Sequence, residues 1–127
     1  MERIHQEVML PAEPQRVYDA LTQSERFGRM TGRPAAIEPG EGGSFSLFGG
    51  MITGRSIELV PGQRVVQAWR VANWEPGLYS VTRFELRPES QGTRLVFDHT
   101  GFPQDQAQHL ASGWEANYWT PMRNSLP

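Results

Sequence analysis

Apolar and polar residues alternate near the start of the chain. Between residues 3 and 10, Ile4, Val8 and Leu10 share one side of an extended backbone, while polar residues occupy most of the other side. Alternation with a period of two is typical of a strand with one buried face. We therefore expect a half-buried strand over residues 3–10.

A helical period follows this strand. From Pro14 to Leu21 the apolar residues recur at i, i+3, i+4 and i+7, and proline is favoured in the first turn of a helix. Ser24 can cap a second short helix that ends near Gly32. Two short helices are therefore expected directly after the first strand.

The middle of the chain, from Pro34 to Gly101, has the pattern of strands separated by turns. Short segments such as "PGEGG", "PGQ" and "PESQG" divide the apolar runs. Connections this short favour antiparallel neighbours over parallel crossovers. The candidate strands are Ala35–Glu38, Ser44–Phe48, Ile52–Val60, Arg64–Val71, Tyr79–Arg87 and Thr93–Thr100.

The last segment returns to a helical period. Its apolar stripe consists of Ala107, Leu110, Ala111, Trp114, Tyr118 and Met122. Gly113 and Pro121 interrupt the stripe, and a kink is expected near Pro121. A single curved antiparallel sheet whose apolar face is covered by this long helix accounts for the order of the elements.

Composition is that of one ordinary globular domain, and we treat residues 1–127 as a single domain. The 127 residues are 38% hydrophobic and 20% charged, with a net charge of -2. Nucleic-acid binding is not expected, because phosphate contacts need a clustered excess of Lys and Arg. No apolar run approaches the roughly 20 residues of a membrane span, and the N-terminal sequence lacks a signal-peptide core. We therefore expect a cytoplasmic protein.

The sequence offers little for catalysis or for metal binding. Cysteine is absent, and His5, His99 and His109 lack the spacing of zinc sites. Asp98 and His99 are neighbours on a candidate strand, so their side chains should point to opposite faces. No Gly-x-Ser-x-Gly motif of a nucleophilic serine occurs. These features favour a non-enzymatic protein with no metal and no cofactor.

Several glycine and aromatic positions form a recognisable combination. They are Gly42, Gly43, Phe45, Gly54, Pro61, Trp69-Arg70, Trp74, Thr93, Leu95, Gly113-Trp114 and Tyr118-Trp119. In this combination the chain resembles the activator of the heat-shock protein 90 ATPase, specifically its C-terminal domain and stand-alone homologues. The resemblance runs from "VMLPAEPQRVYDALT" to "YWTPM". That family belongs to the START-like (SRPBCC) superfamily.

The resemblance implies an α+β helix-grip (START-like) fold. In this fold a curved antiparallel sheet of about six or seven strands wraps around a long C-terminal helix, and two short helices follow the first strand. A heat-shock protein 90 homologue is an implied partner. The larger N-terminal, chaperone-binding domain of the eukaryotic activator has no counterpart in this sequence. The oligomeric state is left open between monomer and homodimer.

A cavity between the sheet and the long helix is the candidate binding site. Many members of the superfamily have such a cavity, and inward-facing aromatic rows would line it. The candidate lining residues are Phe45, Gln67, Trp69, Phe84, Phe97, His99, Leu110, Trp114 and Tyr118. Glu58 is a candidate polar group at the cavity mouth, where it would need a partner such as an Arg. The alternative interpretation is a packed core in which residues such as His99 are simply hydrogen-bonded.

Three functions fit these observations. The leading hypothesis is a non-enzymatic domain whose cavity binds a small hydrophobic molecule, or which acts as a regulatory module. The first alternative is a co-chaperone that stimulates the ATPase of a heat-shock protein 90 homologue. The second is a polyketide cyclase-like enzyme, which requires His99, Glu58 or Tyr118 to converge in one cavity and transfer a proton.

Overall fold

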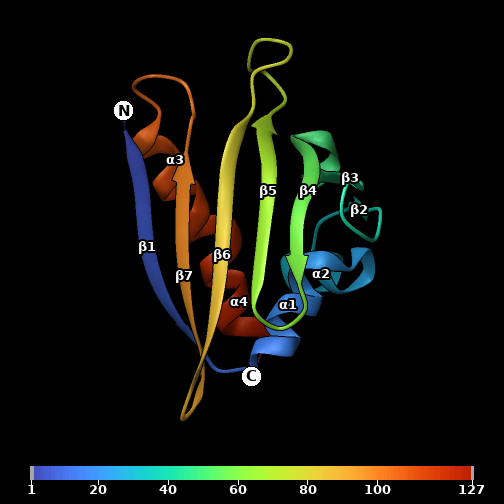
Figure 1. Cartoon of the computed structure of the whole chain (residues 1–127), viewed down its shortest axis with the longest axis vertical. Coiled ribbons are helices and arrows are strands. Elements are labelled where there is room, and N and C mark those ends of the chain that lie inside the picture. Colours follow the sequence, from blue (N-terminus) through green and yellow to red (C-terminus); the bar gives the residue numbers. More distant parts are fainter. Residues whose placement is uncertain (1, 127) are drawn as a thin grey trace.

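One antiparallel sheet of seven strands runs through the molecule in the order β1-β7-β6-β5-β4-β3-β2 (Figure 1). The computed structural model describes residues 2–126. The strands are β1 (Arg3–Leu10), β2 (Ala35–Ile37), β3 (Ser44–Leu47), β4 (Ile52–Val60), β5 (Arg64–Val71), β6 (Ser80–Glu89) and β7 (Gly92–Thr100). The helical segments are α1 (Pro14–Thr22), α2 (Ser24–Thr31), η1 (Phe48–Gly50), α3 (Ala107–Trp114), η2 (Glu115–Trp119) and α4 (Thr120–Ser125).

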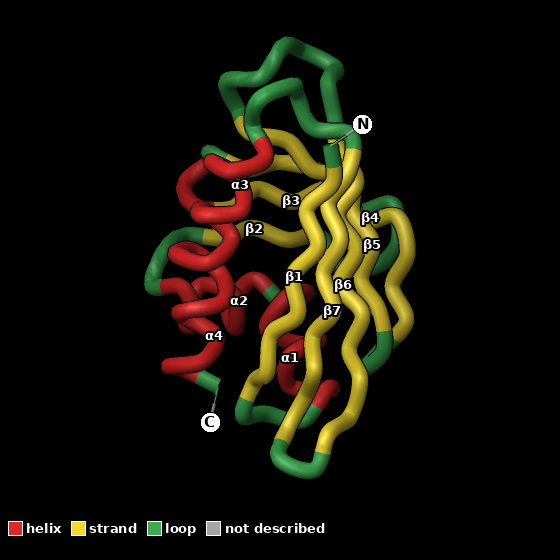
Figure 2. Tube along the Cα trace, turned by 90° about the vertical axis from the view of Figure 1, so that its left-hand side faces the viewer, coloured by secondary structure: helices red, strands yellow, loops and turns green. Residues whose placement is uncertain are grey.

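The helices cover one face of this sheet. Figure 2 shows α3, η2 and α4 as one continuous rod along the curved sheet, with α1 and α2 closing its lower end. The last strand, β7, pairs with β1. The N-terminal strand therefore forms one edge of the sheet, next to the rod. This arrangement confirms the helix-grip fold, including the two short helices after the first strand.

Phe45 on β3 can point into the core because its neighbour on β4 is a glycine. The register places Phe45 opposite Gly54, and a Cβ on Gly54 would lie 2.5 Å from the Phe45 ring and 2.0 Å from the Ala68 carbonyl oxygen. Any side chain at Gly54 would therefore displace either the ring or β5. The glycine explains how the β3–β4–β5 corner packs closely around an aromatic side chain.

A β-bulge in β4 reverses the direction of its later side chains. The register shifts between Ser56 and Glu58, so Ile57 becomes an extra residue and Leu59 takes the inward position opposite Val65. Glu58 is thereby turned to the outer face, where its carboxylate lies 2.6 Å from the Arg64 guanidinium. The prediction of Glu58 at the cavity mouth was wrong, because strict alternation along β4 ignores the extra residue. The Arg partner that we expected for Glu58 is present, but the pair lies on the outer face of the sheet and not at the cavity mouth.

The C-terminal rod departs from a regular α-helix at Glu115–Trp119, shortly before Pro121, near which we expected a kink. Residues Glu115–Trp119 form a π-helical turn, and the Thr120 backbone N–H donates to the Glu115 carbonyl, five residues earlier. Pro121 then lies within the first turn of α4, where its missing N–H is tolerated. The wide turn brings the consecutive residues Tyr118 and Trp119 both into the core. A regular helix would place them 100° apart, so the π turn widens the buried stripe.

Candidate functional site

A cavity of about 160 Å³ lies between the sheet and the C-terminal rod, at the end where β4 and β5 meet η1 and α3. Its walls come from the sheet, the rod and the segment that connects α2 to β2. The lining residues are Arg33, Phe48, Met51, Ile52, Trp69, Val71, His109, Leu110, Gly113, Trp114, Asn117 and Tyr118. Most of these side chains are apolar or aromatic, as in small-molecule pockets.

The predicted site residues divide into two groups. Trp69, Leu110, Trp114 and Tyr118 line the cavity. Phe45, Gln67, Phe84, Phe97 and His99 do not line it but are buried in the core beside it. The strand alternation correctly places all of these strand residues on the inner face, but it cannot distinguish a cavity wall from a packed interior.

Two inaccessible polar atoms of cavity-lining residues have no hydrogen-bond partner within residues 2–126. They are Trp69 Nε1 and Tyr118 Oη, on side chains of residues that are 3% and 4% exposed. Burial raises the pKa of Tyr118 strongly, and the nearby Trp69 indole only partly opposes this rise. The Trp69 indole opposes the rise as a hydrogen-bond donor toward the Tyr118 hydroxyl, although the two groups do not meet strict hydrogen-bond geometry. Buried polar groups without partners cost about 1–3 kcal/mol each, so their presence beside a cavity needs an explanation.

His99, by contrast, has both ring nitrogens engaged. Trp114 Nε1–H donates to His99 Nδ1 over 3.1 Å, and Ser80 Oγ lies 2.7 Å from His99 Nε2. Ser80 itself donates to the Trp69 carbonyl, so this network assigns the proton to Nε2. Burial lowers the pKa of His99 to about 3, which keeps the ring neutral. His99 therefore fixes the positions of two cavity-lining tryptophans without touching the cavity.

The polar groups proposed for an enzyme do not converge. Tyr118 lines the cavity, whereas His99 is buried in the core beside it and Glu58 lies on the outer face of the sheet. Proton transfer by a convergent set of these groups, which the cyclase-like alternative requires, has no geometric support.

Phe48 is a cavity residue that the sequence reasoning missed. Its backbone has a φ of 56°, in the left-handed region that non-glycine residues rarely adopt, and it precedes Gly49 and Gly50. The Phe48 ring makes edge contacts with Phe27 and Tyr118, both at 5.6 Å between centroids. Those contacts explain how the strained backbone is held. The "FGG" sequence was the available signal, but it reads equally as the end of a strand.

The mouth of the cavity combines an exposed apolar side chain with a cation. Met51 is 56% exposed, although it lines the cavity. The Arg33 guanidinium carbon lies 5.0 Å from the centroid of the Phe48 ring, a distance typical of cation–π contacts. His109 and Asn117 of the rod complete the rim. None of these four residues was singled out by the sequence pattern, because they lie in turns or on the polar side of a helix.

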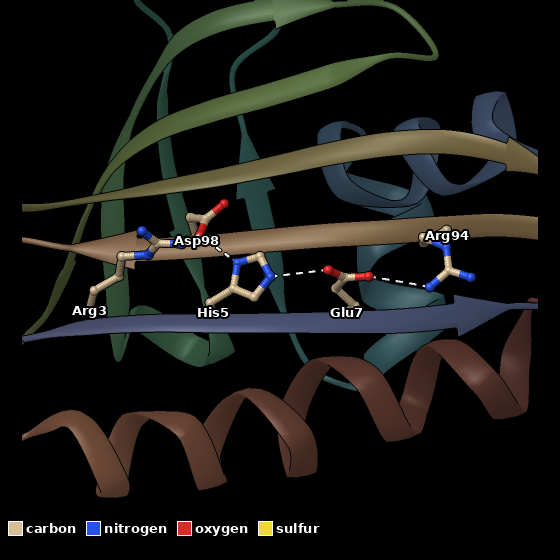
Figure 3. Close-up of polar contacts among 5 residues, drawn as sticks. All are labelled: Arg3, His5, Glu7, Arg94 and Asp98. Atoms are coloured by element: carbon tan, nitrogen blue, oxygen red, sulfur yellow. Dashed lines mark hydrogen bonds and ion pairs between the residues drawn. The ribbon is translucent and has the colours of Figure 1, made fainter.

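The outer face of the sheet has a charged network well away from the cavity. Figure 3 shows Arg3, His5 and Glu7 of β1 beside Arg94 and Asp98 of β7. His5 contacts Asp98 at 2.8 Å and Glu7 at 3.1 Å, while Arg94 reaches Glu7 at 3.3 Å. Hydrogen bonds to Asp98 and Glu7 raise the pKa of His5. These side chains are substantially exposed, so the network is a solvated surface and each pair contributes little to stability.

Two further properties concern the described residues alone. Within residues 2–126 there is no cluster of three or more His, Cys, Asp or Glu side chains that could hold a metal ion. No helix in the same range is long and apolar enough to cross a membrane.

Comparison with known proteins identifies the family. A family model described as "Activator of Hsp90 ATPase homolog 1-like protein" matches residues 11–126. The chain belongs to this family. A Dictyostelium discoideum member, "Activator of 90 kDa heat shock protein ATPase homolog", is 32% identical over 105 residues, which are 82% of this chain and 27% of that protein. The Homo sapiens homolog 1 is 25% identical over 113 residues, 89% of this chain and 33% of that protein.

The Hsp90 ATPase activator homologues of known structure share the fold. An HSP90 activator from Plasmodium falciparum superposes with a TM-score of 0.79 at 25% identity, covering 92% of this chain and 89% of that one. The Aha1 dimer from Colwellia psychrerythraea gives a TM-score of 0.84 at 18% identity, covering 99% and 96%. At that identity the second likeness concerns the fold alone. The chain spans about a third of the curated activators it matches.

Proposed function

We propose that this domain binds a small, largely apolar molecule in the cavity between β4–β5 and the C-terminal rod. The observation that carries the proposal is the cavity itself, an open space between the sheet and the rod whose lining is mostly apolar and aromatic.

The size of the cavity limits the ligand. At about 160 Å³ it is smaller than the roughly 300–1,000 Å³ typical of pockets for drug-sized ligands. Apolar cavities of about 150 Å³ accommodate benzene. We therefore propose a ligand with one ring or a short branched chain, and not a lipid or a polycyclic compound.

A thermal-shift panel of one-ring compounds tests this proposal. At about one hundred times its dissociation constant, a bound compound should stabilise the native state by about 2.7 kcal/mol. Gly113→Leu should abolish the shift, because Gly113 lines the cavity and a Cβ there meets only Asn117 Nδ2, at 3.8 Å. The added side chain would occupy the ligand space without a clash at its base.

Ala116→Leu is the matched control, because it adds the same side chain to an exposed position of the same rod. This variant should keep the ligand-induced shift. A panel without any stabilising compound, or equal shifts in wild type and Gly113→Leu, would contradict the proposal. Mass spectrometry of the gently purified protein gives an independent reading, since a retained small molecule should be absent from Gly113→Leu.

A second proposed function is stimulation of the ATPase of a heat-shock protein 90 homologue. Its support is the family match over residues 11–126, together with the printed names of the relatives. We place this partnership in the cytoplasm, the location predicted from the sequence. The test measures the chaperone's ATP turnover with and without excess domain. Unchanged turnover together with no co-elution at micromolar concentrations would contradict it.

A further inference from the structure

The mouth of the cavity has a net positive charge in the described part of the chain. Arg33 is exposed and lines the cavity, and no Asp or Glu is among the lining residues. No Asp or Glu elsewhere in residues 2–126 forms an ion pair with the Arg33 guanidinium. The guanidinium is therefore a cation that keeps its donors available at the entrance of an apolar space.

The backbone around Arg33 is fixed to the cavity wall. The Phe48 backbone N–H donates to the Pro34 carbonyl over 2.9 Å. On the other side, the Arg33 backbone N–H donates to Thr31 Oγ1 over 3.3 Å. The Arg33 guanidinium carbon lies 5.0 Å from the centroid of the Phe48 ring, whose backbone has the left-handed φ of 56°. These contacts restrict the cation before a ligand arrives, which lowers the entropic cost of binding.

The rod supplies two more polar side chains to the same mouth. His109 and Asn117 are exposed and line the cavity, and the imidazole and the amide can each donate a hydrogen bond. A carboxylate at this position would face Arg33 on one side and these side chains on the other. A ligand cation would face the Arg33 guanidinium and no carboxylate, so like charges would oppose its binding.

Behind the mouth the lining offers aromatic surface and no charged side chain. The ring centroids of Phe48 and Tyr118 lie 5.6 Å apart, and those of Tyr118 and Trp114 lie 4.2 Å apart. A carboxylate moved inward against these rings would lose its hydration without gaining a cation, which is strongly unfavourable. The charged end of a ligand therefore belongs at the mouth, and its apolar body belongs inside.

We propose that the cavity selects small apolar carboxylates over neutral or cationic molecules of the same shape. Arg33 binds the carboxylate at the mouth, and the apolar body of the ligand packs against the rings of Phe48 and Trp114. This proposal rests on the proposed function, since it names the ligand class for the same cavity.

Benzoate, benzamide and benzamidine test this selectivity, because they share one planar shape and are anionic, neutral and cationic at pH 7. Titrations followed by two-dimensional NMR give each dissociation constant, and the backbone amide signal of Gly113 reports binding inside the cavity. We expect benzoate to bind about tenfold more tightly than benzamide, as a charge-assisted hydrogen bond provides, and benzamidine to bind most weakly. Raising the salt concentration should weaken the binding of benzoate and leave that of benzamide unchanged.

Two substitutions of Arg33 assign the selectivity to its charge. Arg33→Gln should bring the affinity for benzoate down to that for benzamide, and Arg33→Glu should reverse the order of benzoate and benzamidine. Arg87→Gln and Arg87→Glu are the matched controls and should keep the wild-type order, because Arg87 is exposed on the outer side of β6. Thermal unfolding without a probe verifies that each variant is folded.

Three outcomes would overturn the ligand class. They are equal binding of benzoate and benzamide to the wild type, a preference for benzoate that persists in Arg33→Gln, and benzoate binding that leaves the Gly113 signal unchanged. Absence of binding by all three probes would overturn it as well. Each of these results leaves the proposed function to be decided separately by the wider thermal-shift panel and by Gly113→Leu.

Discussion

Two neighbouring regions of the interface between the sheet and the C-terminal rod differ in how their buried polar groups are hydrogen-bonded. Around His99, the indole of Trp114, the imidazole and the Ser80 hydroxyl form one hydrogen-bonded chain that ends on the Trp69 carbonyl. Around Tyr118, the hydroxyl and the Trp69 indole N–H have no partner within residues 2–126. Trp69 takes part in both regions, through its carbonyl in the first and its side chain in the second.

Burial alone therefore does not identify a binding residue. His99 and Tyr118 are both buried among aromatic rings, and both have pKa values shifted by desolvation. Only Tyr118 lines the cavity, and its hydroxyl has no hydrogen-bond partner within residues 2–126. A satisfied network stabilises one arrangement of the core, whereas an unsatisfied buried group lowers stability.

The largest expected effect is an acid sensitivity caused by His99. Its folded pKa of about 3 lies below the ordinary value of 6.5, so the unfolded chain binds the extra proton first as the pH falls. Stability is then lost by about 1.4 kcal/mol per pH unit below 6.5, or about 2 kcal/mol between pH 7 and pH 5. Urea denaturation at several pH values measures this slope.

His99→Gln is the reference for that measurement. Its amide can accept from Trp114 and donate to Ser80, but it does not titrate. The difference in stability between wild type and variant should shrink as the pH falls from 7 to 5. A difference that is independent of pH would show that His99 is not held neutral in the folded state. Comparing the two proteins also cancels the contribution of His5 to the pH dependence of stability. Because the pKa of His5 is raised in the folded state, that contribution stabilises the protein as the pH falls.

Removing the Ser80 hydroxyl should destabilise the hydrogen-bonded region around His99. Ser80→Ala leaves His99 Nε2–H without its acceptor in a site that is closed to water. We expect a loss of about 1.5 kcal/mol in the free energy of unfolding. Thermal and urea unfolding at pH 7 provide the measurement, and an unchanged stability would contradict the assigned network.

Removing the Tyr118 hydroxyl should have the opposite sign. Tyr118→Phe deletes one buried oxygen that lacks a partner, so the free energy of unfolding should rise by about 1 kcal/mol in the absence of ligand. A loss of stability on a par with that of Ser80→Ala would remove the contrast between the two regions.

The outer charged network should give the smallest effect. Asp98→Asn weakens the contacts of Asp98 with His5 and Arg3, and we expect a change of only a few tenths of a kcal/mol, because these side chains are exposed. The change should be present below about pH 6, where His5 is protonated, and should fade as the pH rises through the raised pKa of His5. An NMR titration of His5 checks this directly, since its pKa should fall towards the ordinary value in the variant.

The sequence was most informative where a pattern repeats along an element. Period-two alternation placed Gln67 and Trp69 on the inner face of β5, and the apolar stripe placed Leu110, Trp114 and Tyr118 against the sheet. It was least informative at single-residue irregularities. The bulge at Ile57 moved Glu58 to the outer face, and the π turn replaced the kink expected at Pro121. Both depend on contacts with neighbouring elements, which local spacing does not encode.

The family, the order of the elements and the inner face of most strands could be predicted from the amino-acid pattern alone. Those properties follow from local periodicity and from glycine and aromatic positions that recur in a known combination. Which buried residues line the cavity depends on how side chains from distant segments fill the interior, and local patterns do not contain that information. Arg33, Phe48 and Asn117 are far apart in the chain, yet they share one cavity with Trp69 and Tyr118.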